Sequence, residues 1–95
     1  MVESDSIGLE HIMSWMYILR NENTDRYYIG STSDLGRRIK QHRLGLTRTT
    51  RVLGTYTLVY VEEFDSISEA RLREKKLKSY KSKKYIKWLI NRMGQ

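Results

Sequence analysis

Residues 15–31 read WMYILRNENTDRYYIGS and decide the fold of this 95-residue chain. The aromatic and branched residues of 15–19 favour a β-strand, and so do those of 26–31. Between them, residues 21–25 (NENTD) have the composition of a turn. The stretch therefore predicts a β-hairpin with a five-residue loop.

The segment after the hairpin predicts a helix. Thr32 or Ser33 can cap it, and Asp34 opens it where a carboxylate favours the positive end of the helix dipole. Apolar residues and one histidine recur at helical spacing on one side of this helix. That side carries Leu35, Ile39 and His42. The helix is expected to end near Gly45.

The second half of the chain predicts a loop over 46–54, a well-buried strand over 55–64 and two further helices. Ser66 and Glu69 form a capping-box pattern that opens a helix reaching about residue 79. Ser82 can cap a third helix, with Tyr85, Trp88 or Leu89, and Arg92 along one side. The expected fold is an α+β (α/β) domain in the order β-β-α-β-α-α, with a mostly antiparallel three-stranded sheet flanked by three helices.

Length and composition limit the domain organisation and the compartment. A chain of 95 residues suits one domain, which we expect over 15–95 after an N-terminal extension over 1–14. There is no cysteine, so thiolate metal sites are excluded. Neither a signal peptide nor an apolar run of about 20 residues is found, which predicts a cytoplasmic protein without membrane contact.

Positive charge is concentrated at the C-terminal end. Residues 66–95 carry ten Lys or Arg against two Glu, whereas residues 1–25 carry one Arg against five acidic residues. Such a basic segment favours a polyphosphate partner, with an anionic membrane surface and a solvated helix face as the alternatives. Within it, Glu74 is either a salt-bridge partner of Lys78 or a metal ligand placed among phosphate-binding residues.

Four sequence segments together resemble the GIY-YIG nuclease domain, and most closely its small single-domain bacterial members. They are 15–18 (WMYI), 28–32 (YIGST), 34–42 (DLGRRIKQH) and 62–78, which contains the glutamate-bearing helix. The resemblance covers about residues 15–92. The first motif departs from the family by reading Trp-Met-Tyr, and Ser31 and Thr32 stand where some relatives have a lysine.

This resemblance implies an active site built from two tyrosines, an arginine, a histidine and a glutamate. Tyr17 and Tyr28 would line the site, one of them as general base, although sheet aromatics at these places could also be purely structural. Arg38 and His42 lie one turn apart on a helix and could contact phosphate or relay a proton. Tyr27 is expected to pack on the opposite face of the sheet.

Glu74 matches the metal-binding glutamate of the family, while Glu69 is explained by its capping role. Magnesium accepts one or two carboxylates and keeps several waters, so one glutamate suffices for Mg²⁺, with Mn²⁺ as a substitute. The family often carries an asparagine late in the domain. Asn91 is the candidate here, and helix-end capping explains it equally well.

The predicted function is a divalent-metal-dependent endonuclease that hydrolyses DNA with low sequence specificity, in DNA repair or recombination. The alternatives are a nucleic-acid-binding module on the same fold with little catalysis, and a basic protein that binds ribosomal RNA. RNA as substrate and the choice between monomer and dimer stay open. The expected phosphate contacts are Arg48, Arg51, Lys75, Lys76, Lys78, Lys81, Lys83 and Lys84.

Overall fold

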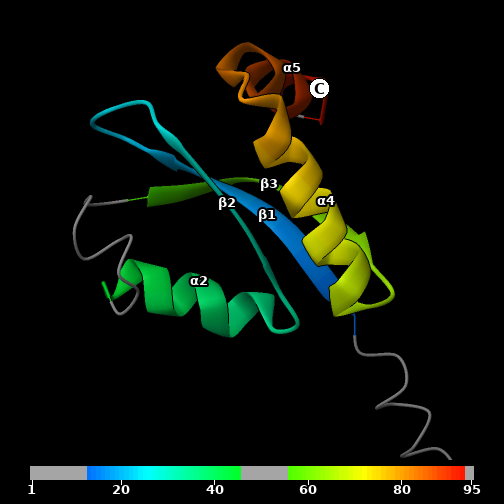
Figure 1. Ribbon diagram of the computed structural model, residues 1–95. Coiled ribbons are helices and arrows are strands. Elements are labelled where there is room, and N and C mark those ends of the chain that lie inside the picture. Colours follow the sequence, from blue (N-terminus) through cyan, green and yellow to red (C-terminus); the bar gives the residue numbers. More distant parts are fainter. Residues whose placement is uncertain (1–12, 46–55, 94–95) are drawn as a thin grey trace, which may run out of the picture.

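The computed structural model describes residues 13–45 and 56–93 and shows three strands and three helices in those ranges (Figure 1). The elements follow the predicted order β-β-α-β-α-α, and the α+β class is confirmed. They are β1 (Ser14–Asn21), β2 (Tyr27–Thr32), α2 (Leu35–Arg43), β3 (Tyr56–Phe64), α4 (Ile67–Tyr80) and α5 (Lys83–Met93).

The three strands form an antiparallel sheet in the order β2-β1-β3. In the predicted hairpin, Trp15 pairs with Thr32 and Arg20 pairs with Tyr27, so the loop spans residues 22–26. Asn21 holds this loop, because its side-chain oxygen accepts from the amides of Asn23 and Thr24. As the central strand, β1 is enclosed on both faces, which explains why its middle residues are all apolar or aromatic.

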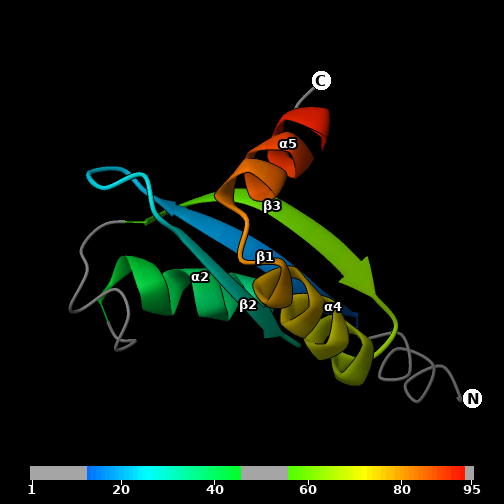
Figure 2. The same cartoon turned by 45° about the horizontal axis from the view of Figure 1, so that its top comes forward.

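Helix α2 covers one face of the sheet, and α4 and α5 cover the other (Figures 1 and 2). Because side chains alternate along a strand, neighbouring residues of β1 serve different faces. The main core lies on the face of α4 and α5, where Tyr27 also packs, as predicted for it. Its buried members are Met16, Ile18, Ile29, Tyr60, Leu77, Ile86 and Leu89.

Strand β3 is less buried than its apolar sequence predicts. Only Tyr60 is buried, whereas Thr57, Leu58 and Glu63 are exposed. The prediction of a well-buried strand was wrong because β3 lies at an edge of the sheet, beside β1 alone. A register shift at Ile18 and Leu19, opposite Tyr60 and Leu58, marks a bulge that twists this edge.

The N-cap of helix α2 lies one or two residues after the predicted caps, Thr32 and Ser33. The cap is Asp34, whose carboxylate accepts from the amide of Arg37 at 3.1 Å. Thr32 instead accepts from the amide of Asp34 at 3.0 Å and so closes the turn before the helix. An aspartate satisfies the free amides of a first turn as well as Ser or Thr does. The predicted stripe holds, since His42 is buried and Leu35 and Ile39 are half-buried.

Both C-terminal helices begin at their predicted caps. The hydroxyl of Ser66 accepts from the Glu69 amide at 3.2 Å, and that of Ser82 accepts from the Tyr85 amide at 3.0 Å. Of the two residues predicted as alternatives on α5, Leu89 is buried and Trp88 is not, and Ile86, which was not predicted, is also buried. Trp88 is half exposed, with the Arg92 guanidinium 5.1 Å from its ring centroid.

Two predicted segments fall on residues outside the described ranges. These are most of the N-terminal extension over 1–14 and the loop over 46–54; Ser14 already belongs to β1. Among the described residues, no helix has the length and apolar character needed to cross a membrane.

Candidate active site

Two tyrosines of the hairpin lie on the face of the sheet that α2 covers. Tyr17 stands opposite Gly30 and Tyr28 stands opposite Leu19, so the two tyrosines are diagonal neighbours. Their ring centroids are 6.3 Å apart. Tyr17 is fully buried, whereas Tyr28 is half-buried. The hairpin thus brings together the two tyrosines that the sequence motifs single out.

Gly30 is required by the ring of Tyr17. A Cβ atom at position 30 would lie 2.6 Å from both Cζ and Oη of Tyr17 and 3.1 Å from Cε2 of Tyr28. The ring therefore lies across the backbone of β2 at the place where a side chain would otherwise stand. The Tyr17 hydroxyl consequently lies over β2, an edge strand of the sheet.

Helix α2 supplies Arg38 and His42 to the same place. The Tyr17 hydroxyl lies 3.2 Å from Nε2 of His42, and the rings of His42 and Tyr28 meet edge to face with centroids 5.3 Å apart. Arg38 acts on the Tyr17 hydroxyl through its charge and through a hydrogen bond. An arginine and a histidine one turn apart on the helix therefore converge on one hydroxyl.

Burial shifts the pKa values of both Tyr17 and His42. It raises the pKa of Tyr17 well above its ordinary value, and the nearby Tyr28 adds to this, while Arg38 acts in the opposite direction. Burial also lowers the pKa of His42, with the charge of Arg38 as a second cause. At neutral pH the tyrosine is protonated and the histidine neutral. A neutral imidazole can accept the Tyr17 hydroxyl proton at Nε2.

Glu74 reaches the site from α4, on the other side of β2. Its Oε1 accepts from the Ser31 hydroxyl at 2.6 Å, and its Oε2 lies 2.6 Å from Nζ of Lys78. The Glu74 charge also acts on the Tyr17 hydroxyl, since it contributes to the raised pKa of that group. Of the two alternatives from the sequence, the structure shows the salt bridge of Glu74 with Lys78, and the metal-ligand role stays a prediction.

The neighbouring residue Arg73 fixes the orientation of α4. Its Nε donates to Oε1 of Glu62 on β3 at 2.8 Å, and its Nη2 donates to Oε2 at 3.2 Å. Glu62 also accepts from the Tyr60 hydroxyl, and burial raises the pKa of Tyr60 to about 12. A bidentate pair of this kind restrains rotation of the helix. Glu74 is thereby held on the side of α4 that faces β2.

Glu74 is the one carboxylate that the described lining of its hollow offers to a magnesium or manganese ion, beside three cationic side chains. The carboxylate side chain is 21% exposed and lines a hollow of about 390 Å³ with Ser31, Arg71, Lys75 and Lys78. Among the described residues, no three His, Cys, Asp or Glu side chains are placed to share a metal. A hard cation that takes one carboxylate and keeps its waters fits this donor set. Lys78 would have to leave the carboxylate when the ion binds.

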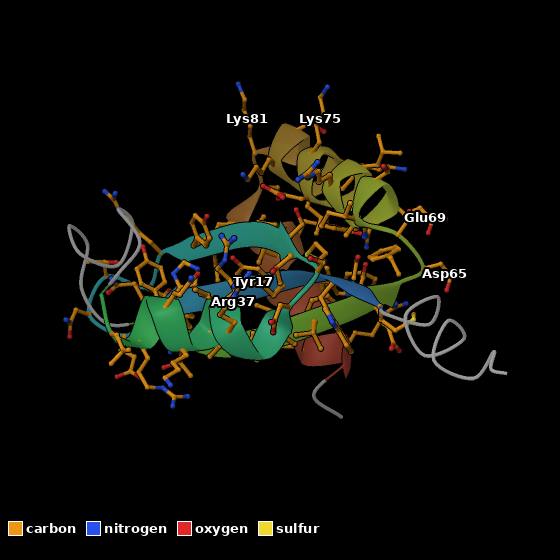
Figure 3. All side chains as sticks on the ribbon, turned by 90° about the horizontal axis from the view of Figure 1, so that it is seen from below. Tyr17, Arg37, Asp65, Glu69, Lys75 and Lys81 are labelled. Carbon is orange, nitrogen blue, oxygen red and sulfur yellow. The ribbon has the colours of Figure 1, made fainter. Side chains whose placement is uncertain are left out.

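The predicted phosphate contacts divide into four groups. Lys75 and Lys78 line the Glu74 hollow, and Lys78, Lys81 and Lys83 line a second pocket further along α4. In Figure 3, which looks onto the α2 side, Lys75 and Lys81 extend outward from α4 while Tyr17 lies at the centre. Lys76 and Lys84 are exposed elsewhere, and Arg48 and Arg51 lie outside the described residues.

Two residues beside Glu74 were not predicted from the sequence. Ser31 and Arg71 both line the Glu74 hollow, and the Ser31 hydroxyl donates directly to the carboxylate. The sequence offers no signal for that bond because its partners are 43 positions apart. Asn91, the weak candidate, is exposed on α5, and this helix lies on the other face of the sheet from α2 (Figures 1 and 2).

The fold is a three-stranded α+β domain in which two tyrosines, an arginine and a histidine gather on one face of the sheet, with a glutamate on the other side of β2. The family model of the GIY-YIG catalytic domain matches residues 13–87, so the chain belongs to this nuclease domain family.

Similar proteins include two UPF0213 proteins and one solved structure. The chain is 40% identical over 63 residues to UPF0213 protein CPE1444 of Clostridium perfringens, covering 65% of this chain and 67% of that one. It is 43% identical over 53 residues to UPF0213 protein VNG_2274C of Halobacterium salinarum, covering 55% and 69% respectively. The solution structure of UPF0213 protein BH0048 from Bacillus halodurans aligns with a TM-score of 0.52 at 32% identity, covering 83% of each chain.

Proposed function

We propose that this protein is a divalent-metal-dependent endonuclease that hydrolyses DNA phosphodiester bonds. One observation carries the proposal: the Tyr17 hydroxyl lies 3.2 Å from Nε2 of His42 and is exposed to the charge of Arg38 from α2 and, more weakly, to that of Glu74 from α4, although the two helices lie on opposite faces of the sheet. A purely structural tyrosine needs no such convergence of charges. Metal-assisted phosphodiester hydrolysis, in contrast, uses a proton acceptor, a cationic group and a metal ligand around one phosphate.

Each residue of the site has a distinct role in this proposal. Arg38 binds the phosphate oxygens and stabilises the charge that develops on them, because a guanidinium stays protonated at any working pH. Glu74 holds the ion, which when bound supplies Lewis-acid stabilisation of the phosphate and leaving oxygen. Ser31 orients the Glu74 carboxylate through its hydrogen bond.

The two tyrosines differ in what they can reach. Tyr28 is half-buried and can contact the attacking water, whereas Tyr17 is enclosed and keeps its proton. We assign to Tyr17 the role of holding the neutral imidazole of His42 in place. The centroids of the His42 and Tyr28 rings are 5.3 Å apart. His42 then takes at Nε2 the proton that the water loses, and its hydrogen bond with Tyr17 reverses, so that the imidazolium N–H donates to the tyrosine oxygen.

The pH dependence of cleavage tests this assignment of His42. Its pKa is lowered, so the imidazole becomes charged only below 6.5, and we expect the cleavage rate to fall as pH drops through that lowered value. As the pH falls, His42 of the unfolded chain is protonated before His42 of the folded protein. The stability associated with neutral His42 is therefore present above pH 6.5 and declines below it. His42→Asn should lower the rate and remove this acid limb. An unchanged profile in the variant would assign the limb to another group.

DNA contacts in this proposal come from lysines and arginines around the Glu74 hollow. Arg71, Lys75 and Lys78 line it, and further lysines follow on α4 and α5. Contacts of this kind bind phosphates without reading bases, so binding should depend strongly on salt and weakly on sequence. Cytoplasmic location, a role in DNA repair or recombination, and the choice of DNA over RNA rest on the sequence alone.

The second candidate function is DNA binding without catalysis. The ion pair between Lys78 and Glu74 favours it, because it neutralises the carboxylate that a metal would use. Such a pair between partly exposed groups contributes little stability, so a bound ion can displace it at small cost. The two candidates therefore differ in a single measurable property, which is cleavage in the presence of metal.

The test incubates the purified protein with supercoiled plasmid in Mg²⁺ or Mn²⁺, with a chelator control and the variant Glu74→Ala. Nicked and linear products are expected with wild-type protein and metal only. If wild type and variant both bind DNA and neither cuts, the binding module is correct. Equal cleavage by both proteins would indicate a contaminating nuclease or a misplaced site.

A further inference from the structure

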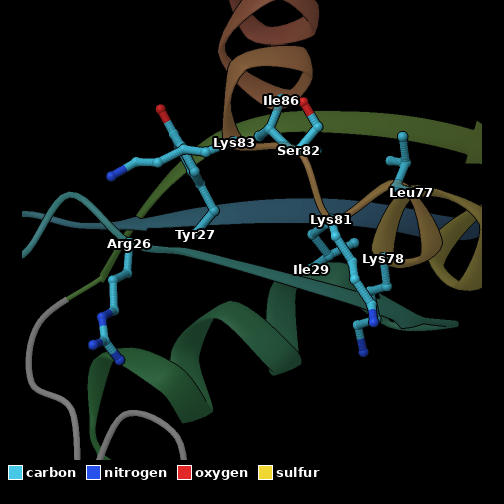
Figure 4. Close-up of a pocket in the computed structure, with 9 residues that line it drawn as sticks. All are labelled: Arg26, Tyr27, Ile29, Leu77, Lys78, Lys81, Ser82, Lys83 and Ile86. Atoms are coloured by element: carbon cyan, nitrogen blue, oxygen red, sulfur yellow. The ribbon is translucent and has the colours of Figure 1, made fainter.

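A second pocket lies along β2 beyond the Glu74 hollow, under the turn between α4 and α5 (Figure 4). Its volume is about 300 Å³, at the lower end of the range for small-molecule sites. Apolar side chains of Ile29, Leu77 and Ile86 belong to its lining, together with the aromatic ring of Tyr27. A ligand here would need a flat or apolar part of modest size.

The charged side chains around this pocket are all cations. They are Arg26, Lys78, Lys81 and Lys83, and among the described residues no carboxylate lines the pocket. In Figure 4, Lys83 and Tyr27 lie at one end and Lys78 and Lys81 at the other. Two of the cations have acidic neighbours outside the lining, since Lys83 lies 3.4 Å from Asp25 and Lys78 pairs with Glu74. The chemistry suits a ligand with an aromatic body and phosphates.

The backbone at Lys81 supports a binding role. Lys81 has φ 50° and ψ 39°, the left-handed conformation, at the C-terminal end of α4. Glycine is the usual residue at such a helix end, and any other residue costs about 1 kcal/mol or more. A glycine would form this turn without strain but would supply no charge. The lysine accepts the strain and places a cation at the pocket.

The pocket continues the Glu74 hollow, because Lys78 lines both. Glu74 and Lys81 are seven residues apart along α4, so the distance between them along the helix axis is about 10 Å. A strand in duplex DNA rises about 3.4 Å per nucleotide and an unpaired strand extends further, so this distance corresponds to at most about three nucleotides. A strand whose phosphate lies at Glu74 could therefore place a nearby nucleotide in the pocket.

We propose that this pocket binds one unpaired nucleotide of the DNA strand, within about three nucleotides of the phosphate that is cut. Its base would stack beside Tyr27 over Ile29, Leu77 and Ile86, and its phosphates would contact Lys78, Lys81 and Lys83. A base in a duplex cannot reach this apolar lining without leaving the stack. The inference rests on the proposed function for its position relative to the cut, and it predicts a preference for single-stranded or flapped DNA.

The test measures fluorescence anisotropy of a labelled 12-mer single strand and of the same sequence as a duplex. Every protein carries Glu74→Gln, so no DNA is cut and binding is read separately from catalysis. Lys81→Gly removes the cation and relieves the turn, so it should unfold no more easily than its parent. Its affinity for the single strand should fall about tenfold, as should that of Tyr27→Ala, since stacking on one aromatic ring gives an effect of this size.

The matched control is Lys40→Ala, which removes one exposed lysine on α2, away from the pocket. Its single-strand affinity should stay within about twofold of the parent, as expected for the screened effect of one distant charge. Equal losses in Lys40→Ala and Lys81→Gly would show that only net charge matters and would overturn the pocket. Displacement of the strand by dTMP at similar concentration would also overturn the proposal, since it would identify a site for free nucleotides. A failure of wild type to cut plasmid would leave these binding results unaffected.

Discussion

Glu74→Gln is expected to cut DNA about 1,000-fold more slowly than the wild-type protein at saturating metal and DNA, a loss of about 4 kcal/mol. Glutamine keeps the size of the side chain and can still bond to Ser31, but it lacks the negative charge that holds a divalent cation. Single-turnover cleavage of a labelled oligonucleotide gives the rate, and anisotropy gives the affinity for DNA. The affinity should change little, because the DNA is held mainly by lysines and arginines.

The control for this variant is Glu69→Gln, one and a half turns earlier on α4. Glu69 lies against the Ser66 hydroxyl at 3.4 Å at the start of the helix and is exposed. Its replacement should alter stability by a few tenths of a kcal/mol and leave the cleavage rate near that of wild type. Equal loss in both variants would show that a negative charge anywhere on α4 matters, and would refute a specific ligand role for Glu74.

Gly30→Ala is expected to destabilise the fold by about 1–3 kcal/mol and to reduce cleavage about 100-fold. The new Cβ would lie 2.6 Å from Cζ and Oη of Tyr17, and this fully buried ring must then move. Because the hydroxyl of that ring contacts His42 and Arg38, its displacement misaligns both helical residues. Urea unfolding measures the stability, and single-turnover cleavage measures the rate.

Gly36→Ala provides the comparison for Gly30→Ala. A Cβ atom at position 36 would come no nearer than 3.9 Å to its closest neighbour, Oδ1 of Asp34. Alanine also favours a helix more than glycine does, so this variant should be at least as stable as wild type. If Gly30→Ala matched Gly36→Ala in stability and rate, the close approach of Tyr17 to β2 would not matter for the site.

The order of the elements and the helix caps were predictable because their signals are local. Ser66 and Ser82 each accept from an amide three residues later, and the hairpin is decided within residues 15–31. The cap of α2 was misassigned because Thr32, Ser33 and Asp34 are all good capping residues. Their choice depends on how the chain leaves β2, and local propensity does not contain that geometry.

The features that the sequence could not predict depend on contacts between distant segments. The exposure of β3 follows from its place at the edge of the sheet, which the strand sequence does not encode. Ser31 was not predicted as a partner of Glu74, because β2 and α4 meet only in the folded chain. Spacing gave Arg38 and His42 as helix neighbours, but the buried hydroxyl on which they converge required the structure.

Manganese binding to the protein tests most directly whether Glu74 is a metal ligand as well as a partner of Lys78. The free Mn²⁺ signal in electron paramagnetic resonance gives the affinities of wild type, Glu74→Gln and Lys78→Met without any cleavage. We predict that Glu74→Gln weakens binding at least about tenfold, and that Lys78→Met strengthens it because no ammonium competes for Oε2. Equal Mn²⁺ affinity in wild type and Glu74→Gln would contradict the metal-dependent site proposed for this protein.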